Sequence, residues 1–230
     1  MSWILYRGTS SGELGLVVVK LSSPPRAARR VQPYEIEGRH GALHVSDGAF
    51  KAVKLTATLQ MLGTNRTDQV SEWLDGSGDL VLSSEPDRCY KAAVYDAIDY
   101  TRIRLPGGDT YDLLQVTFDC TPFRYLRNPL KTTITGTAVE KLVNPGNIEA
   151  APKLILTGSG DGTLRIGGET LQFSGLNGQL TIDCEAMMLF SDAPGVSMVG
   201  DFPVLGRGVT EAQLGGGITE LVVWPNWRWA

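Results

Sequence analysis

The sequence predicts an all-β protein with one short helix, from three observations: alternating strands, glycine-rich turns between them, and a single helical stripe. Apolar residues occupy every second position across residues 53–61, and the residues between them are polar. A period of two is that of a strand with one buried face and one exposed face. The same alternation recurs over residues 113–120 and 179–184.

Turn signals separate the predicted strands. Glycine and asparagine tolerate positive φ, so short segments rich in them connect antiparallel strands. The predicted turns are residues 106–109, 158–162, 167–168 and 177–178. Turns at this spacing indicate a sandwich or barrel, and they do not fit alternating strands and helices.

One segment, residues 65–74, has the period of a helix. Val70, Trp73 and Leu74 fall at i, i+3 and i+4 and form one apolar stripe. Asn65 or Thr67 is predicted to cap its start. Such a helix would close one side of a β-barrel.

The chain is predicted to form two domains. Proline and asparagine interrupt the strand pattern between about residues 125 and 147, and we place the division at residues 1–135 and 136–230. The final strand is a candidate to return to the first domain. Residues 22–33 are predicted to be a long polar loop or extended arm that carries Arg26, Arg29 and Arg30.

The composition narrows the classes of function. The 230 residues carry a net charge of −4, whereas a nucleic-acid-binding protein is expected to show a basic face. The sequence has no apolar run of the length that spans a membrane, and its apolar start is too short for a signal peptide. We therefore expect no nucleic-acid recognition, no membrane insertion, and a protein that stays where it is made.

The three cysteines, at positions 89, 120 and 184, are far apart and show no metal-binding spacing. Two of them could pair, but each falls in a predicted strand, where cysteine behaves as a small hydrophobic residue. Free buried thiols in a reducing compartment are the favoured interpretation.

No motif indicates catalysis, a metal or a cofactor. His40 and His44 could share a metal on a helix, but glycines surround them, and a turn followed by a strand is the favoured interpretation. Residues 158–163 lack the ending of a phosphate loop. Asp96 with Asp99, or Asp183 with Glu185, could be proposed as the acid/base pair of a glycoside hydrolase, but the required separation in space does not follow from sequence. Asp183 and Glu185 are predicted to share one solvated strand face.

Two clusters remain as candidate contact surfaces. Trp224, Trp227 and Trp229 could stack on sugars or dock a protein, or they could fill the core of a final strand. The arginines of residues 26–30 could contact an acidic neighbouring subunit or a nucleic-acid backbone, or form a solvated loop.

The order of motifs along nearly the whole chain resembles the distal tail protein family of siphophages and related prophages. The motifs are residues 38–41 (GRHG), 72–74 (EWL), 78–82 (GDLVL), 87–91 (DRCYK), 117–125 (TFDCTPFRY), 144–147 (NPGN), 151–152 (AP), 182–183 (ID) and 200–205 (GDFPVL). His40 departs from the family, which often has an acidic residue there, and so does the glycine run at residues 215–217.

The resemblance implies an N-terminal β-barrel with one helix, similar to tail-tube proteins, and a C-terminal galectin-like β-sandwich. It implies a structural protein of the virion tail tip, made in the bacterial cytoplasm, whose first domain forms a hexameric ring. The implied partners are further copies of the chain, the tail-tube protein, a tail-associated baseplate protein and receptor-binding proteins. Arg26, Arg29, Arg30, Pro106 and Gly107 are the candidate ring or partner contacts.

Three other functions compete with this one. The first is a carbohydrate-binding module that uses the terminal tryptophans, although the second half of the chain lacks histidine for the usual sugar site. The second is a tail-associated hydrolase, which no motif supports. The third is another tail-tube component, against which the predicted second β-domain argues.

Overall fold

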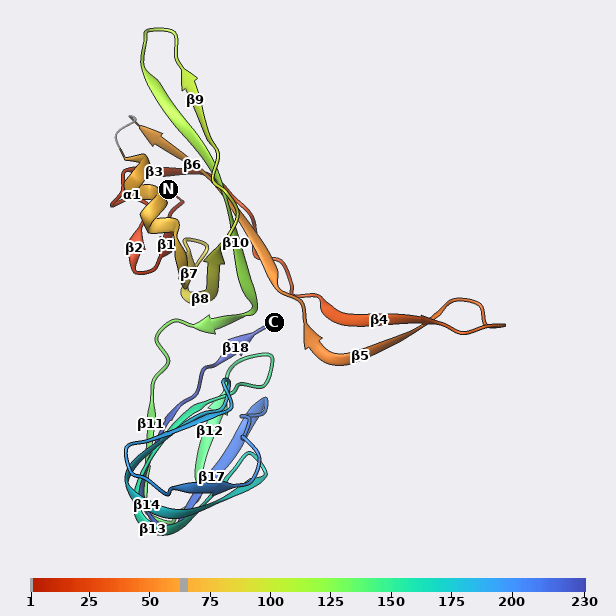
Figure 1. Cartoon of the computed structure of the whole chain (residues 1–230), viewed down its shortest axis with the longest axis vertical. Helices are drawn as coiled ribbons and strands as arrows, with labels where there is room; N and C mark the ends of the chain where they lie inside the picture. Colours follow the sequence, from red (N-terminus) through yellow and green to blue (C-terminus); the bar gives the residue numbers. More distant parts are fainter. Residues whose placement is uncertain (1, 63–65) are drawn as a thin grey trace. The chain divides into compact units, whose positions relative to one another are not determined.

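The computed structural model describes residues 2–62 and 66–230 (Figure 1). They divide into two compact units, residues 2–127 with Ala230, and residues 128–229. Each unit is built almost entirely of antiparallel strands, as the sequence predicts. The predicted cap Asn65 lies outside the described residues. The units are described one at a time.

The first unit contains ten strands and one helix among its described residues. They are β1 (Ile4–Tyr6), β2 (Thr9–Ser10), β3 (Leu16–Leu21), β4 (Arg29–Glu35), β5 (Ala42–Phe50), β6 (Val53–Leu62), α1 (Thr67–Leu74), β7 (Gly76–Leu82), β8 (Glu85–Val94), β9 (Tyr100–Arg104) and β10 (Thr110–Leu126). One curled sheet has the order β2-β1-β7-β8-β10-β6-β3, and β9 adds to β10. Strands β4 and β5 form a separate two-stranded sheet.

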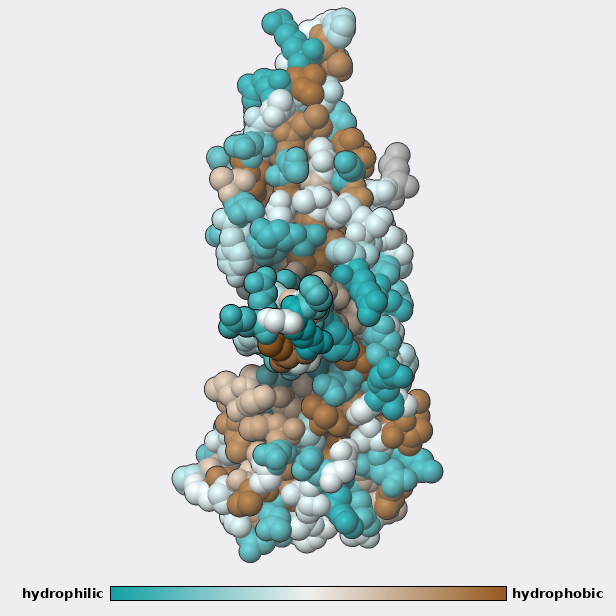
Figure 2. Space-filling view, turned by 90° about the vertical axis from the view of Figure 1, so that its right-hand side faces the viewer, coloured by the Kyte–Doolittle hydropathy of each residue, from teal (hydrophilic) through white to brown (hydrophobic). Residues whose placement is uncertain are grey.

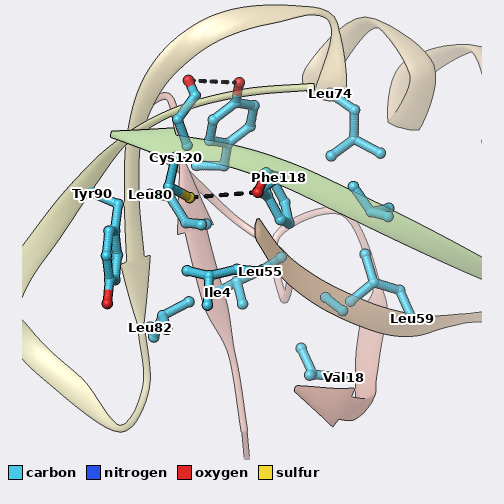
Figure 3. Packing of buried hydrophobic residues seen from close by; sticks show 14 of the residues in the cluster. Ile4, Val18, Leu55, Leu59, Leu74, Leu80, Leu82, Tyr90, Phe118 and Cys120 are labelled. Carbon is cyan, nitrogen blue, oxygen red and sulfur yellow. Dashed lines mark hydrogen bonds between the residues drawn. The ribbon is translucent and has the colours of Figure 1, made fainter. Parts of the chain in front are cut away.

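The core of this unit lies on one face of the β6–β10 pair. The alternation predicted for residues 53–61 is confirmed, because Val53, Leu55, Ala57, Leu59 and Met61 are all buried. Ten consecutive residue pairs join β6 to β10 in one register, so the apolar positions of both strands share a face. Figure 3 shows side chains from several strands pointing into this interior.

Helix α1 covers part of the same interior. Its buried residues are Val70, Trp73 and Leu74, the predicted apolar stripe. The indole Nε1 of Trp73 donates to the carbonyl of Tyr6 at 3.0 Å, which ties the helix to β1. The helix starts at Thr67 with Arg66 in the capping position, so Thr67 is the first helical residue and not the predicted cap.

The second unit contains eight strands. They are β11 (Thr132–Thr135), β12 (Glu140–Asn144), β13 (Lys153–Ile166), β14 (Glu169–Asp183), β15 (Met188–Ser191), β16 (Ser197–Val199), β17 (Gly208–Trp224) and β18 (Arg228–Trp229). Seven of them form one sheet in the order β11-β17-β13-β14-β15, with β12 added to β17 and β16 added to β14, and β18 lies outside this sheet. The predicted hairpin turn at residues 167–168 is confirmed, because it joins β13 to β14.

Two other predicted turns are wrong. Residues 158–162 lie inside the continuous strand β13, and residues 177–178 lie inside β14. The two segments face each other, with Gly158 opposite Gly178, and the register of β13 shifts between Gly160 and Gly162. Here glycine marks a bulge in a long strand and not a reversal of the chain.

The glycines are needed because neighbouring backbones approach closely. A Cβ added at Gly158 would lie 2.6 Å from the carbonyl oxygen of Gly217, and one added at Gly217 would overlap the carbonyl of Ser159. Strands β13, β14 and β17 all bend at these positions. Each therefore contributes one half to a layer with β11 and β15, and the other half to a layer with β12 and β16.

A buried asparagine organises the start of this unit. The Asn144 side chain donates to the carbonyls of Ile148, Leu205 and Gly206 at 3.0 to 3.2 Å, and its oxygen accepts the Gly146 N–H at 2.8 Å. Each polar atom of this buried amide is thus satisfied. The motif at residues 144–147 therefore fixes a loop that would otherwise leave backbone groups unpaired.

Candidate functional site

Most residues of the β4–β5 hairpin, which we call the arm, are exposed. Its two strands pair only with each other in the described part of the chain, and every residue of β4 is exposed. The arm extends away from the curled sheet (Figure 1). An isolated two-stranded hairpin is only marginally stable in water, so an arm of this kind is expected to be covered by another surface.

The two faces of the arm differ. Tyr34 lies opposite Leu43, and Gln32 lies opposite Val45, so Tyr34, Leu43 and Val45 share one face and are all exposed. Figure 2 looks toward the tip of the arm and shows mostly hydrophilic residues with a smaller apolar area. This apolar face is not among the contact surfaces predicted from the sequence, although the alternation of Leu43 and Val45 with polar residues indicates it.

The base of the arm is fixed by aromatic contacts. The Arg29 guanidinium lies 4.9 Å from the centre of the Phe50 ring, and Phe50 packs edge-to-face on Phe123 of β10 at 5.5 Å. The Lys51 N–H donates to the carbonyl of Ala28 at 2.8 Å, which joins the two ends of the arm. The arm therefore leaves the unit from one closed point.

The predicted arginine contacts fall at this base. Arg30 forms an ion pair across the arm with Asp47, and the hydrogen bond from Arg30 lowers the pKa of the Asp47 carboxyl. Arg29 is held over Phe50, and Arg26 is exposed in the segment that leads to the arm. Arg29 and Arg30 thus stabilise the arm itself, which leaves Arg26 as the predicted arginine contact that lies outside it.

The β9–β10 hairpin carries the other predicted contacts. Pro106 and Gly107 lie exposed at its tip, inside a turn closed by the hydrogen bond from the Leu105 N–H to the Asp109 carbonyl at 2.8 Å. Arg102 and the buried carboxylate of Asp112 pair across the hairpin at 3.0 Å. This ion pair fixes the register of the hairpin where it leaves the sheet.

The three tryptophans do not form one exposed surface. Trp224 is 38% exposed and lies under the ammonium of Lys131, which is 5.9 Å from the centre of its ring. Trp227 is only 8% exposed, and Trp229 is half-buried. Trp224 is therefore the accessible candidate, and Trp227 is buried.

The histidines and carboxylates considered above for metal binding or catalysis do not form a site in the described residues. His40 lies in the turn of the arm and His44 in β5, both exposed. Asp183 accepts hydrogen bonds from the N–H groups of Glu185 and Ala186, so it shapes a turn. Within residues 2–62 and 66–230, no group of three or more metal-binding side chains comes together.

The three cysteines are free and buried, which confirms the interpretation favoured from the sequence. Burial raises the pKa of the Cys89 thiol to about 11 and those of Cys120 and Cys184 to about 12. A thiol with a raised pKa holds little thiolate near neutral pH, and the thiolate is the nucleophile. These side chains are therefore part of the packing. In the described residues, no helix has the length and apolar character to cross a membrane.

The sequence matches no protein-family model and no curated protein. The structure does match solved structures. One is the crystal structure of the Dit protein of SPP1, described as a paradigm of the hub adsorption apparatus in phages that infect Gram-positive bacteria. The match covers 97% of this chain and 98% of that chain with a TM-score of 0.75 and 16% sequence identity. The fold implied by the sequence resemblance is therefore confirmed.

Proposed function

We propose that the chain is a structural, non-enzymatic protein of the tail tip of a long-tailed phage or prophage. The observation that carries the proposal is the fold, which is shared with SPP1 Dit over 97% of this chain and 98% of that one. Motifs in the same order along the sequence support it independently. A plain tube subunit would need only the first unit, so the second β-unit favours a distal tail protein over a tube protein.

In this role six copies form a closed ring through their first units. A ring uses a heterologous interface, in which each copy offers a different patch to each of its two neighbours. The arm supplies one such patch, since its apolar face of Tyr34, Leu43 and Val45 is exposed. The tip of the β9–β10 hairpin, with Pro106 and Gly107, supplies another contact to a neighbour or a tail partner.

The partners of the ring are the tail-tube protein on one side and baseplate and receptor-binding proteins on the other. The second unit is the carrier of the outer components. The absence of a catalytic motif in the sequence and the raised thiol pKa values favour a scaffold over a hydrolase.

Light scattering over a rising concentration series tests the ring. The monomer has a mass of 24.9 kDa, so a hexamer has a mass of about 149 kDa. We expect a species of that mass. A monomer at every concentration, also after mixing with the tail-tube protein, would contradict the ring.

Removal of the arm tests the contact. The ends of the arm are joined by the Lys51–Ala28 hydrogen bond, so residues 30–49 can be replaced by an Asn-Gly turn. We expect this variant to keep its β-sheet circular dichroism and to remain monomeric. In a second variant, an Asn-Gly turn replaces residues 105–109 and closes the Arg104–Thr110 pair, which tests the tip of the β9–β10 hairpin separately. Loss of assembly in the armless variant alone would assign the ring contact to the arm. Hexamers from the armless variant would exclude the arm as a ring contact.

A further inference from the structure

A run of apolar residues on the second unit remains uncovered. Met187, Met188, Leu189 and Phe190 are consecutive, and each is between 40% and 71% exposed. The last three belong to β15, in which all four residues are exposed. A run of this length on a surface is expected only where it serves a function, because it otherwise promotes aggregation.

Strand β15 also has an open backbone edge. It ends the sheet, and in the described residues it pairs with β14 alone. Met188 and Phe190 lie opposite Asp183 and Thr181 on the outer face, whereas Leu189 lies opposite the buried Ile182. The edge thus offers free peptide groups with apolar side chains on both sides, which is what a pairing strand requires.

The edge is held in place before any partner binds. Asp183 accepts the N–H groups of Glu185 and Ala186 at 3.1 and 3.0 Å, and Glu185 pairs with Arg228 at 3.4 Å. Met187 has a φ of 55°, a left-handed conformation that a methionine rarely adopts. The β14–β15 turn therefore presents an exposed methionine at some conformational cost, and such strain concentrates at binding sites.

We propose that β15 is a docking edge for an extended segment of another protein, which adds to the sheet as a strand. The identity of the partner rests on the proposed function, because the segment would belong to an outer component of the tail. The segment has apolar residues at alternate positions and basic residues at its ends.

The short length of β15 and the acidic residues near its ends favour a short extended segment as the occupant. Four residues span only about 13 Å of strand, too little for the roughly 800 Å² per partner of a stable interface between two globular surfaces. A short extended segment uses such an edge fully, because the backbone supplies most of its hydrogen bonds. Asp183 lies at one end of β15 and Asp192 follows the other, so basic residues fit the ends of the segment.

A defined peptide tests the edge on the full chain. The probe is Lys-Met-Met-Leu-Phe-Ser-Lys, which copies residues 187–191 between lysines. Aligned antiparallel about its leucine, it places its phenylalanine beside Met188 and its second methionine beside Phe190, a favourable sulfur–aromatic arrangement. We expect fluorescence anisotropy to give a Kd below about 100 μM, and the amides of residues 188–191 to gain protection from hydrogen exchange.

Two altered peptides separate strand pairing from simple apolar adhesion. N-methylation of alternate residues removes the backbone donors and leaves the side chains, and it should abolish binding. Replacement of both lysines by glutamates should weaken binding at least tenfold at low salt. Equal binding of the N-methylated peptide, or no binding of the original peptide at 1 mM (roughly −4 kcal/mol), would overturn the proposal.

Protein variants locate the site. Met188→Thr with Phe190→Thr keeps strand-forming residues at exposed positions, so it should fold normally and bind the probe at least tenfold more weakly. The matched control is Val143→Thr with Val209→Thr, an exposed cross-strand pair of β12 and β17, which should leave binding unchanged. Equal loss of binding in both variants would contradict a site at β15.

The titration does not need the ring. A chain that binds the probe but stays monomeric, also after mixing with the tail-tube protein, would contradict the ring and support the edge. A hexamer that fails to bind the probe would support the ring and overturn the edge.

Discussion

The β6–β10 pair of the first unit and the β13–β17 pair of the second are both long antiparallel pairs, but they are shaped by different means. The first keeps one register over ten residue pairs, and its apolar residues alternate without interruption. The second shifts register twice around Gly158 and Gly162, where neighbouring backbones approach closely. The register of the first pair thus depends on its alternating side chains. The register of the second pair depends also on glycines, which have no side chain, at the positions where it shifts.

The largest loss of stability is expected in the β13–β17 pair, where a side chain at Gly217 would have no room. Gly217→Ala places a Cβ against the carbonyl of Ser159, and both groups are backbone or attached to it, so neither can move aside cheaply. We expect the free energy of unfolding to fall by about 4 kcal/mol or more, as measured by urea denaturation. Gly206→Ala is the control, because nothing lies within 4 Å of its added Cβ and its φ is not positive. A harmless Gly217→Ala would remove the distinction between the two pairs.

A smaller loss is expected from the side chains of the first pair. Leu55 is fully buried in β6, and Leu55→Ala should lower the free energy of unfolding by about 3 kcal/mol through lost burial and a cavity. Leu62→Ala, at an exposed position of the same strand, should change it by less than about 0.5 kcal/mol. Urea denaturation of the two variants in parallel checks the difference, and similar losses would show that β6 does not bury one face selectively.

The smallest expected effect is on the pH dependence of stability, which compares how well the interiors of the two units exclude water. The pKa values of Cys120 in the first unit and Cys184 in the second are both raised to about 12 by burial. The unfolded chain therefore loses these thiol protons first, and above about pH 9 each thiol lowers stability by up to about 1.4 kcal/mol per pH unit. Cys120→Val and Cys184→Val should each flatten the decline between pH 9 and 11 by that amount. Denaturation curves at pH 6–8 are the control, and unequal slopes would show that one interior is wetter.

Much of the fold follows from local pattern in the sequence. The alternation of residues 53–61 and the stripe of Val70, Trp73 and Leu74 are consequences of one buried face, which a single segment reveals by itself. The turn at residues 106–109 is likewise local, and it joins β9 to β10 as expected. The bends at Gly158 and Gly217 could not be predicted in this way, because their cause is a neighbour far away in the sequence.

The candidate surfaces were less predictable for the same reason. Arg29 and Arg30 stand out in the sequence as charges, but their ring and carboxylate partners, Phe50 and Asp47, come from the returning strand of the arm. Residues 187–190 look like an ordinary core strand in the sequence. They lie at an open edge only because the order of strands in the sheet places β15 last, which no local pattern specifies.

The closed base of the arm has an evolutionary consequence. Since Ala28 and Lys51 already meet at 2.8 Å, a change in the number of codons between them alters the reach of the arm without altering the sheet it leaves. Selection would act on insertions and deletions there through the fit of the arm to its partner, and not through the folding of the unit. The segment is thus free to diverge in length while the rest of the first unit keeps its register.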